Sequence, residues 1–310
     1  MTFFRTAART LAGLIPAVMV SVTPVLAQAT NDPPSSDVFI SGVATNNAVS
    51  ETLWHLSDPT NNYFGTRQRA PLQLRTREAA GDSGWNAFAQ VNARTFVGDV
   101  DGNGRDVTLG IDRSFGAARV GLLLTDSTYD LTDATAQQAD SDALSYGLYA
   151  LAEFNETWFV QAFALQSDPD YVVGANAFEA DRTAGGLTVG TGREMGALYV
   201  TGFASINGYS EDHPVVGITP ARTISSTTIS IGSRAYFQPS TTAIGYVGLA
   251  LQHNSFDDGL GNDDDSISPR LSTGYEVQAG PGTFAIDADL GEVVDGTTDI
   301  GVSVGYFVSF

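Results

Sequence analysis

Residues 84–310 alternate between apolar and polar positions over most of their length. Near the end of the chain, for example, Ile300, Val302 and Val304 alternate with small or polar residues. Because neighbouring side chains of a β-strand point to opposite faces, this pattern predicts strands with one apolar face. The pattern recurs in segments of about ten residues, which is the length that a lipid-facing strand of a transmembrane barrel requires.

Twelve such segments can be counted. They cover 85–95, 105–115, 117–129, 143–154, 157–167, 180–191, 197–208, 223–237, 242–253, 266–279, 283–291 and 298–310. The connections alternate in length: long ones are expected at 96–104, 130–142, 168–179, 209–222, 254–265 and 292–297, with short turns between them. Outer-membrane barrels have short periplasmic turns and long external loops, so the C-terminal strand is expected to end in the periplasm.

The second face of these strands distinguishes a membrane barrel from a soluble β-sandwich. It is rich in Gly, Ser and charged residues, whereas the inner face of a sandwich has to form a packed apolar core. The chain also contains 33 glycines, which suits a closed, curved sheet. We therefore predict an all-β protein, a transmembrane antiparallel β-barrel of about 12 strands.

The residues before the barrel divide into two segments. Residues 1–29 resemble a signal peptide, with Arg5 and Arg9 before an apolar stretch and with Ala27-Gln28-Ala29 as the cleavage pattern. Residues 30–83 are polar and irregular, and only residues 48–56 are expected to form a short helix. The predicted organisation is a signal peptide (1–29), a linker, plug or remnant passenger (30–83), and a barrel (84–310).

Several motifs of the barrel segment resemble the autotransporter β-domain. The stretch 102–124 is similar to the second and third strands of that family, and Ser145–Ala150 followed by Trp158–Ala162 is similar to its next hairpin. Tyr306, Val308 and Phe310 belong to a terminal pattern that resembles the signal by which barrels are recognised for assembly. The resemblance implies a twelve-stranded translocator whose pore exports an N-terminal passenger. Only about 54 residues, 30–83, lie where a passenger is expected.

The composition limits the choice of partners and cofactors. The formal net charge is -20 and all 15 basic residues are arginine, so the chain is a poor candidate for nucleic-acid binding. It has no cysteine, and therefore no disulfide or thiolate metal site. We expect no cofactor. The expected partners are outer-membrane lipid, periplasmic chaperones and the barrel-assembly machinery, in the outer membrane of a Gram-negative bacterium.

Two motifs suggest chemistry of other kinds. Gly81-Asp82-Ser83-Gly84 resembles the surroundings of a nucleophilic serine, but none of the three histidines, His55, His213 and His253, lies in a supporting motif. We expect no catalytic residue. Asp99, Asp101 and Asn103 match the first half of a calcium loop and form a weak calcium candidate, because the glutamate expected at the twelfth position is Gly110.

The charged residues on the polar face are expected to line the lumen. They are Arg94, Asp112, Arg119, Glu153, Arg234, Arg270, Glu276, Asp287 and Asp289. The expected turns would align Asp112, Arg119 and Glu153 in one row, and would place Glu276 directly opposite Asp287. Two facing carboxylates need a cation. Four arginines of residues 65–78 are therefore candidates for a plug that enters the lumen: Arg67, Arg69, Arg75 and Arg77.

Three functions remain in competition. The first is a non-enzymatic barrel of the translocator type, with little or no passenger. The second is a porin-like channel for small solutes. The third, which has the weakest support, is a barrel that hydrolyses lipid with His253 at the external end of its strand.

Overall fold

The alternating segments form strands, and these strands close into a barrel. The computed structural model describes residues 36–57, 84–154, 157–217, 219–240, 242–261 and 263–310, all of which belong to one compact unit. The predicted signal peptide and the arginines of 65–78 lie outside the described residues.

The described residues contain one helix, α2 (Ser36–Ser57), and fourteen strands. The strands are β1 (Trp85–Gly98), β2 (Val100–Phe115), β3 (Ala118–Asp133), β4 (Gln138–Phe154), β5 (Trp158–Ser167), β6 (Asp170–Val173), β7 (Asn176–Glu179), β8 (Asp181–Met195), β9 (Leu198–His213), β10 (Arg222–Ser240), β11 (Ala243–Asp257), β12 (Asp263–Ala279), β13 (Gly282–Val294) and β14 (Thr297–Ser309).

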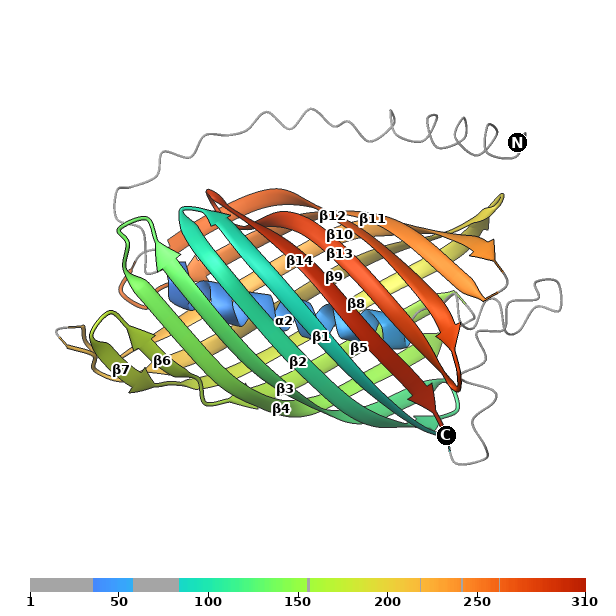
Figure 1. Ribbon diagram of the computed structural model, residues 1–310, viewed down its shortest axis with the longest axis horizontal. Helices are drawn as coiled ribbons and strands as arrows, with labels where there is room; N and C mark the ends of the chain where they lie inside the picture. The colour runs from blue at the N-terminus through green and yellow to red at the C-terminus, as the bar shows by residue number, and fades with distance from the viewer. Residues whose placement is uncertain (1–35, 58–83, 155–156, 218, 241, 262) are drawn as a thin grey trace. The chain divides into compact units, whose positions relative to one another are not determined.

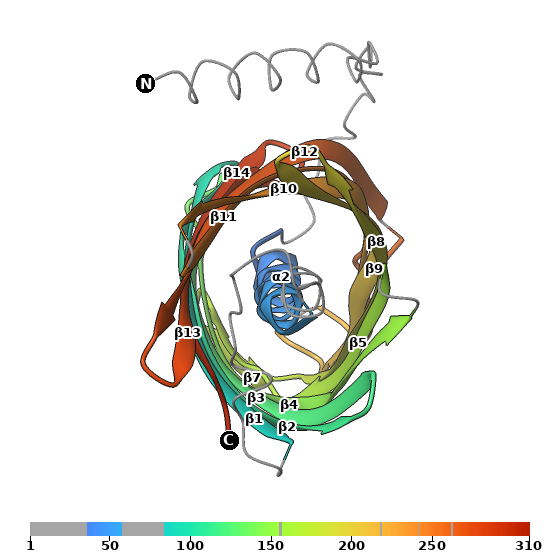
Figure 2. The same ribbon diagram turned by 90° about the vertical axis from the view of Figure 1, so that its right-hand side faces the viewer.

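Twelve of the strands form the barrel wall. Each pairs antiparallel with its neighbours, and β1 pairs with β14 from Asn86↔Ser309 to Gly98↔Thr297, which closes the ring. Figure 2 shows this ring around α2. The predicted fold and strand count are confirmed. The other two strands, β6 and β7, form a small hairpin in the predicted loop 168–179 and extend the sheet from β4.

The connections at one end of the barrel are shorter than the sequence pattern predicts. β1 and β2 are joined through Asp99 alone, and β13 and β14 through Asp295-Gly296, so the predicted loops 96–104 and 292–297 consist mostly of strand. These strands extend beyond their apolar part. Their ends carry mostly polar residues, and for this reason the sequence pattern assigned them to loops. Part of what the sequence predicted as long loops at this end of the barrel is therefore an extension of the strands.

Two turns at the other end differ from prediction by a shift in register. Phe115 pairs with Ala118 around Gly116-Ala117, and Gly116 has a φ of 63°, which glycine adopts without strain. Ala279 pairs with Gly282, so the turn is Gly280-Pro281 rather than a longer loop. In both hairpins, each residue therefore faces a partner that is two positions away from the partner predicted.

The outer face of the wall is apolar. In β14, Ile300, Val302 and Val304 are exposed whereas Ser303 between them is buried toward the lumen. Exposed aromatic residues gather near the short turns, as interfacial rings do in membrane barrels: Trp85, Phe115, Phe154, Trp158, Phe237, Phe284 and Phe310. The face assignment made from the alternation of β14 agrees with this pattern.

Helix α2 runs along the inside of the barrel (Figure 1). The sequence predicted a helix over residues 48–56 only, and the helix extends N-terminally to Ser36. Phe39, near its N-terminal end, packs on Phe256 at a ring-centroid distance of 5.3 Å. Leu56, near its C-terminal end, shares a pocket with Asn86 and Ser309, which lie where β1 begins and β14 ends. The helix therefore spans the lumen with its C-terminus at the end where β1 begins.

No helix among the described residues has the length and hydropathy that crossing a membrane requires.

Candidate functional site

The candidate site is the lumen, where α2 meets the wall. With its side chains included, an α-helix is roughly 10–12 Å in diameter. A twelve-stranded barrel has a wider interior than one that side chains alone can fill, so a helix can occupy it. We call α2 the lumen helix. Polar contacts fix it at three levels.

At its N-terminal end, the lumen helix is held by an arginine–glutamate pair of the wall. Arg182 Nε donates to Glu211 at 2.5 Å, and its Nη2 donates to Ser41 Oγ at 3.0 Å and to the Tyr171 hydroxyl at 2.6 Å. Tyr171 belongs to the β6–β7 hairpin, so this hairpin contributes to the contact. At Gly42 a Cβ atom would lie 2.5 Å from the Tyr209 ring, so only glycine allows this close approach.

In the middle of the barrel, the helix makes one neutral and one charged contact. Thr45 donates to Asp106 at 3.2 Å, and this buried carboxylate also accepts hydrogen bonds from Ser127 and Tyr129, each at 2.7 Å. On another face, Arg234 Nη2 donates to both carboxylate oxygens of Glu51, at 2.8 and 2.7 Å. One guanidinium nitrogen thus contacts both oxygens of the carboxylate, in a charge-assisted pair.

At its C-terminal end, His55 lies between two carboxylates. Its Nδ1 is 2.7 Å from Glu276 Oε1, and its Nε2 is 2.7 Å from Asp287 Oδ2. Nδ1 is hydrogen-bonded to Glu276, and Nε2 faces the Asp287 carboxylate as an ion-pair contact. Two carboxylates on opposite sides of the ring favour the imidazolium, which carries an N–H on each nitrogen. A cation in the last turn also interacts favourably with the helix dipole. The need for a cation between Glu276 and Asp287 was predicted, but His55 supplies it.

A second contact at this end caps the helix. Arg119 Nη1 donates to the Leu56 carbonyl at 2.9 Å, which satisfies one of the carbonyls that a helix C-terminus leaves free. The other nitrogens of Arg119 hold Asp112, with Nε–Oδ1 2.9 Å and Nη2–Oδ2 2.6 Å. Wall and helix are thus joined through one guanidinium.

The predicted row of Asp112, Arg119 and Glu153 is wrong in its third member. Arg119 pairs in register with Leu151, and Glu153 pairs with Phe159 near the start of β5. Tyr149 takes the predicted place of Glu153, because its hydroxyl donates to Asp112 at 2.6 Å. Likewise, Glu276 faces Ala285 rather than Asp287, so these two carboxylates are diagonal neighbours. The Gly280-Pro281 turn explains the second correction, whereas the first follows from the β3–β4 register, in which Thr132 pairs with Gln138.

The remaining predicted lumen residues form a network within the wall. Arg94 and Arg270 each contact both Asp289 and Asp299, and all four residues are buried or nearly so. Four wall strands, β1, β12, β13 and β14, are joined in this way. Such pairing neutralises charges that would otherwise be costly in a lumen shielded from bulk water.

Several lumen residues were not selected from the sequence, although some could have been. Asp106 and Asp299 have the same strand parity as the residues that were chosen. Arg182 lies near the start of the predicted strand 180–191 but was not selected, and Glu211 lies in the predicted loop 209–222. Glu51 and His55 have the four-residue spacing of one helix face, but the helix was predicted without a position in the lumen.

The other candidate chemistry has little structural support. Asp101 accepts a hydrogen bond from the Gly98 amide and Asn103 accepts one from Thr95, so both oxygens serve strand ends. No group of three or more potential His, Cys, Asp or Glu metal ligands occurs among the residues that the structure describes. Ser83 lies outside the described residues. His253 lies on the outer face of β11, in register with Ile229 and Ile267.

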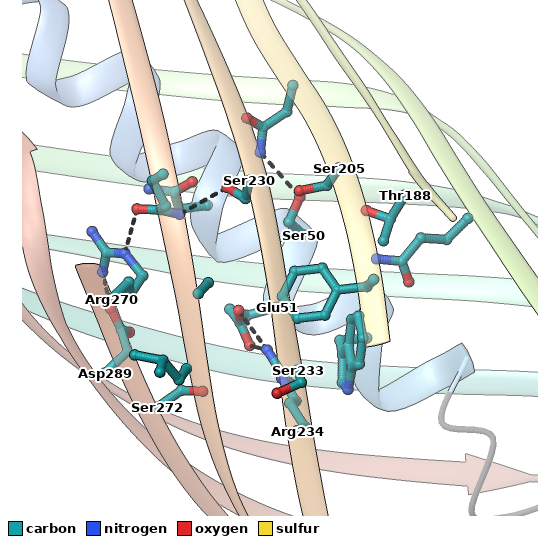
Figure 3. Close-up of a pocket in the computed structure, with 18 of the residues that line it drawn as sticks. Ser50, Glu51, Thr188, Ser205, Ser230, Ser233, Arg234, Arg270, Ser272 and Asp289 are labelled. Carbon is teal, nitrogen blue, oxygen red and sulfur yellow. Dashed lines mark hydrogen bonds and ion pairs between the residues drawn. The ribbon is translucent and has the colours of Figure 1, made fainter. Parts of the chain in front are cut away.

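Beside the lumen helix lies a cavity that encloses about 660 Å³ of free space, open solvent included. We call it the chamber. It lies between one face of α2 and the facing wall, and several hydroxyl groups line it, as Figure 3 shows: Thr188, Ser205, Ser230 and Ser272. The lumen helix therefore fills the barrel only in part.

Comparison with known proteins gives the fold but no family. No protein-family model and no curated protein sequence matches the chain. Among solved structures, the β-domain of the Bordetella autotransporter BrkA is similar over 74% of this chain and 100% of its own, with a TM-score of 0.63 and 15% identity. The translocator domain of the autotransporter NalP from Neisseria meningitidis is similar over 87% of this chain and 99% of its own, with a TM-score of 0.58 and 10% identity.

An outer-membrane channel from Pseudomonas putida F1 is also similar, over 74% of this chain and 98% of its own, with a TM-score of 0.53 and 12% identity. Barrels of this kind thus serve both translocators and channels. The resemblance to autotransporter β-domains seen in the sequence is confirmed at the level of the fold.

Proposed function

We propose that the protein is a non-enzymatic outer-membrane barrel of the translocator type, whose lumen is occupied by the helix that precedes it in the chain. The carrying observation is the direction of the lumen helix. Its C-terminal end lies where β1 begins, at the end of the short turns, and its N-terminal end lies near the β6–β7 hairpin at the opposite end.

This direction is what export of an N-terminal segment through the barrel requires. Short turns face the periplasm in outer-membrane barrels. On that orientation, the chain that precedes β1 returns through the lumen and points its N-terminus outward. If the signal peptide is removed after Ala29, residues 30–35 precede the helix, so the exported segment is chiefly the lumen helix itself.

The contacts of the helix support a resident plug rather than a chain in transit. A translocating segment has to slide past the wall, whereas Glu51, His55 and Leu56 each meet a specific wall partner. Breaking one partner of a buried ion pair typically costs roughly 3–5 kcal/mol. We therefore propose that the structure represents the state after export.

Assembly follows from the same proposal. Residues 1–29 direct export across the inner membrane, periplasmic chaperones carry the chain, and the assembly machinery recognises Tyr306, Val308 and Phe310. The apolar outer face then contacts outer-membrane lipid of a Gram-negative cell.

An epitope inserted between Thr30 and Asn31 tests the proposal. Antibody on intact cells should reach this epitope, whereas the same epitope inserted after Ser240, at a short turn, should be reached only after the outer membrane is permeabilised. If the N-terminal epitope also needs permeabilisation in a chain that forms a heat-modifiable barrel, the translocator proposal fails.

The chamber favours a second candidate, a channel for small solutes. Single-channel conductance of the full chain, compared with a chain that lacks residues 36–57, separates the two. A resident plug predicts a low conductance that rises several-fold on deletion, whereas a channel predicts solute flux through the intact protein. A separate assay tests the non-enzymatic assignment by measuring lipid hydrolysis in vesicles. If the parent protein and His253→Ala both hydrolyse no more lipid than vesicles without protein, the assignment is supported.

A further inference from the structure

The chamber has a defined polar side on the helix. Asn47, Ser50, Glu51 and Trp54 have the spacing i, i+3, i+4 and i+7, which places them on one face. Asn47, Ser50 and Glu51 are half-buried, whereas every other side chain that the structure describes on this helix is buried. The helix thus turns its least covered residues toward the chamber.

The lining holds its charged groups in ion pairs. Its charged members are three arginines and two carboxylates: Arg94, Arg234, Arg270, Glu51 and Asp289. The carboxylate of Asp299, which also pairs with Arg94 and Arg270, is not part of the lining. With Asp299 counted, three arginines and three carboxylates balance, so a ligand in this space would be held by donors that remain unpaired rather than by net charge.

Two guanidinium nitrogens of this lining have no hydrogen-bond partner within the part of the chain that the structure describes. Arg234 is only 3% exposed, and although Glu51 occupies its Nη2, its Nη1 is buried and unpaired among the described residues. The same is true of Arg94 Nε. Buried donors without a partner are rare in proteins, because each has lost its hydrogen bonds to water without gaining a replacement. Both nitrogens are donors that cannot accept, so the missing partner must supply acceptor oxygens.

We propose that the chamber binds a small oxyanion, either a carboxylate or an inorganic oxyanion, with Arg234 as the principal donor. Serine hydroxyl groups of the wall, such as Ser230 and Ser272, can donate to the remaining oxygens. Arg234 is held in place for this role, because its guanidinium carbon lies 4.1 Å from the centre of the Trp54 ring and Glu51 fixes its other edge.

Trp54 provides the readout. The chain has three tryptophans, and Trp85 and Trp158 lie on the outer face. In a Trp85→Phe/Trp158→Phe background, the fluorescence of the full-length barrel in detergent reports on Trp54 alone. The probes are sodium acetate and inorganic phosphate. Sodium chloride at equal ionic strength and neutral acetamide are the controls.

We expect a saturable fluorescence change with acetate, phosphate or both, and the responding probe identifies the source of the oxyanion. Arg234→Gln should weaken binding at least ten-fold. Arg222→Gln is the matched control, because Arg222 lies on the same strand as Arg234 and is also paired with a carboxylate, that of Asp258, but is not part of the chamber lining. It should bind as the parent does.

A second variant keeps the test valid if Arg234→Gln does not fold. Ala250→Leu adds bulk to the chamber without touching an ion pair, and should also weaken binding at least ten-fold. Ala288→Leu, on the outer face of β13, is its control and should bind normally. If neither probe gives a saturable change, or if chloride gives the same change as both, water alone satisfies the arginines and the proposal is overturned.

Discussion

Single residues of the wall differ according to the face they occupy. Val304 of β14 points outward and Ser303 points into the lumen, where it donates to Asp287 at 3.2 Å. A charge at an outward position must leave water for hydrocarbon, whereas a charge in the lumen can find a partner. The same substitution therefore has different costs at neighbouring positions.

We predict that Val304→Arg destabilises the barrel by roughly 2–4 kcal/mol, the cost of arginine on a lipid-facing position near the bilayer midplane. Urea unfolding of the protein in lipid vesicles measures it. Thr298→Arg, outward on the same strand but at its end, should cost roughly 0–1 kcal/mol. If Val304→Arg is as stable as Val304→Leu, β14 does not face lipid at that depth.

At the scale of elements, the lumen helix depends on charges that its own sequence does not balance. His55 joins α2 to β12 and β13 by way of Glu276 and Asp287. Removing the imidazolium leaves two carboxylates close together in a shielded site. Without His55, the C-terminal end of the helix carries no cation that offsets the repulsion between these two carboxylates.

We predict that His55→Ala weakens docking of the helix by roughly 3–5 kcal/mol, the usual cost of removing one partner of a buried ion pair. Faster amide hydrogen exchange in residues 48–56, together with unchanged exchange in the wall strands, measures it. Adding Asp287→Asn should restore part of the protection, since it removes one uncompensated charge. No gain from this second substitution would mean that the carboxylates do not act through His55.

Elements differed in how far the sequence predicted them. The strands could be predicted because lipid on one face and a polar lumen on the other impose a period of two on β14 and its neighbours. The lumen helix could not be predicted in full, since Phe39 and Leu53 are buried against the wall while polar residues such as Thr45 and His55 are buried as well, and this mixture weakens the amphipathic pattern.

The sequence also could not predict which side chains face each other across a turn. Gly280-Pro281 is compatible with loops of two or four residues, and the choice decides whether Glu276 faces Ala285 or Asp287. The need for a cation there could be predicted from the two carboxylates. Its source could not, because His55 is separated from both by more than two hundred residues.

For the molecule as a whole, closure of the ring depends on its last strand. The Phe310 amide donates to the Trp85 carbonyl at 2.9 Å, which completes the pairing of β14 with β1. Phe310 is also 52% exposed at the aromatic end of the barrel. The final residue thus serves both closure and the membrane interface.

We predict that deleting Phe310 reduces the amount of assembled barrel several-fold. The fraction that migrates as a heat-modifiable species in outer-membrane preparations measures it. Phe310→Trp is the control and should assemble normally, because an amphipathic ring at the interface is retained. Normal assembly of the deletion variant would refute a role for this residue in the assembly signal.

The orientation of the whole barrel can be tested with inserted tags. A tag between Thr135 and Ala136, in the β3–β4 connection, should be labelled on intact cells, and so should one beside Leu260. A tag between Gly280 and Pro281 should be labelled only after permeabilisation. Labelling of the last tag on intact cells would reverse the orientation and with it the direction of the lumen helix.

The polar contacts between the lumen helix and the wall restrict how such sequences can change during evolution. Thr45 with Asp106, Glu51 with Arg234, and His55 with Asp287 each join the segment before the barrel to the barrel itself. A change on one side of a pair leaves a buried polar group unmatched until the other side changes too. Among homologues that retain this helix, we therefore expect the three pairs to be exchanged together, and in a homologue that has lost the helix we expect Arg234 to be replaced by an uncharged residue.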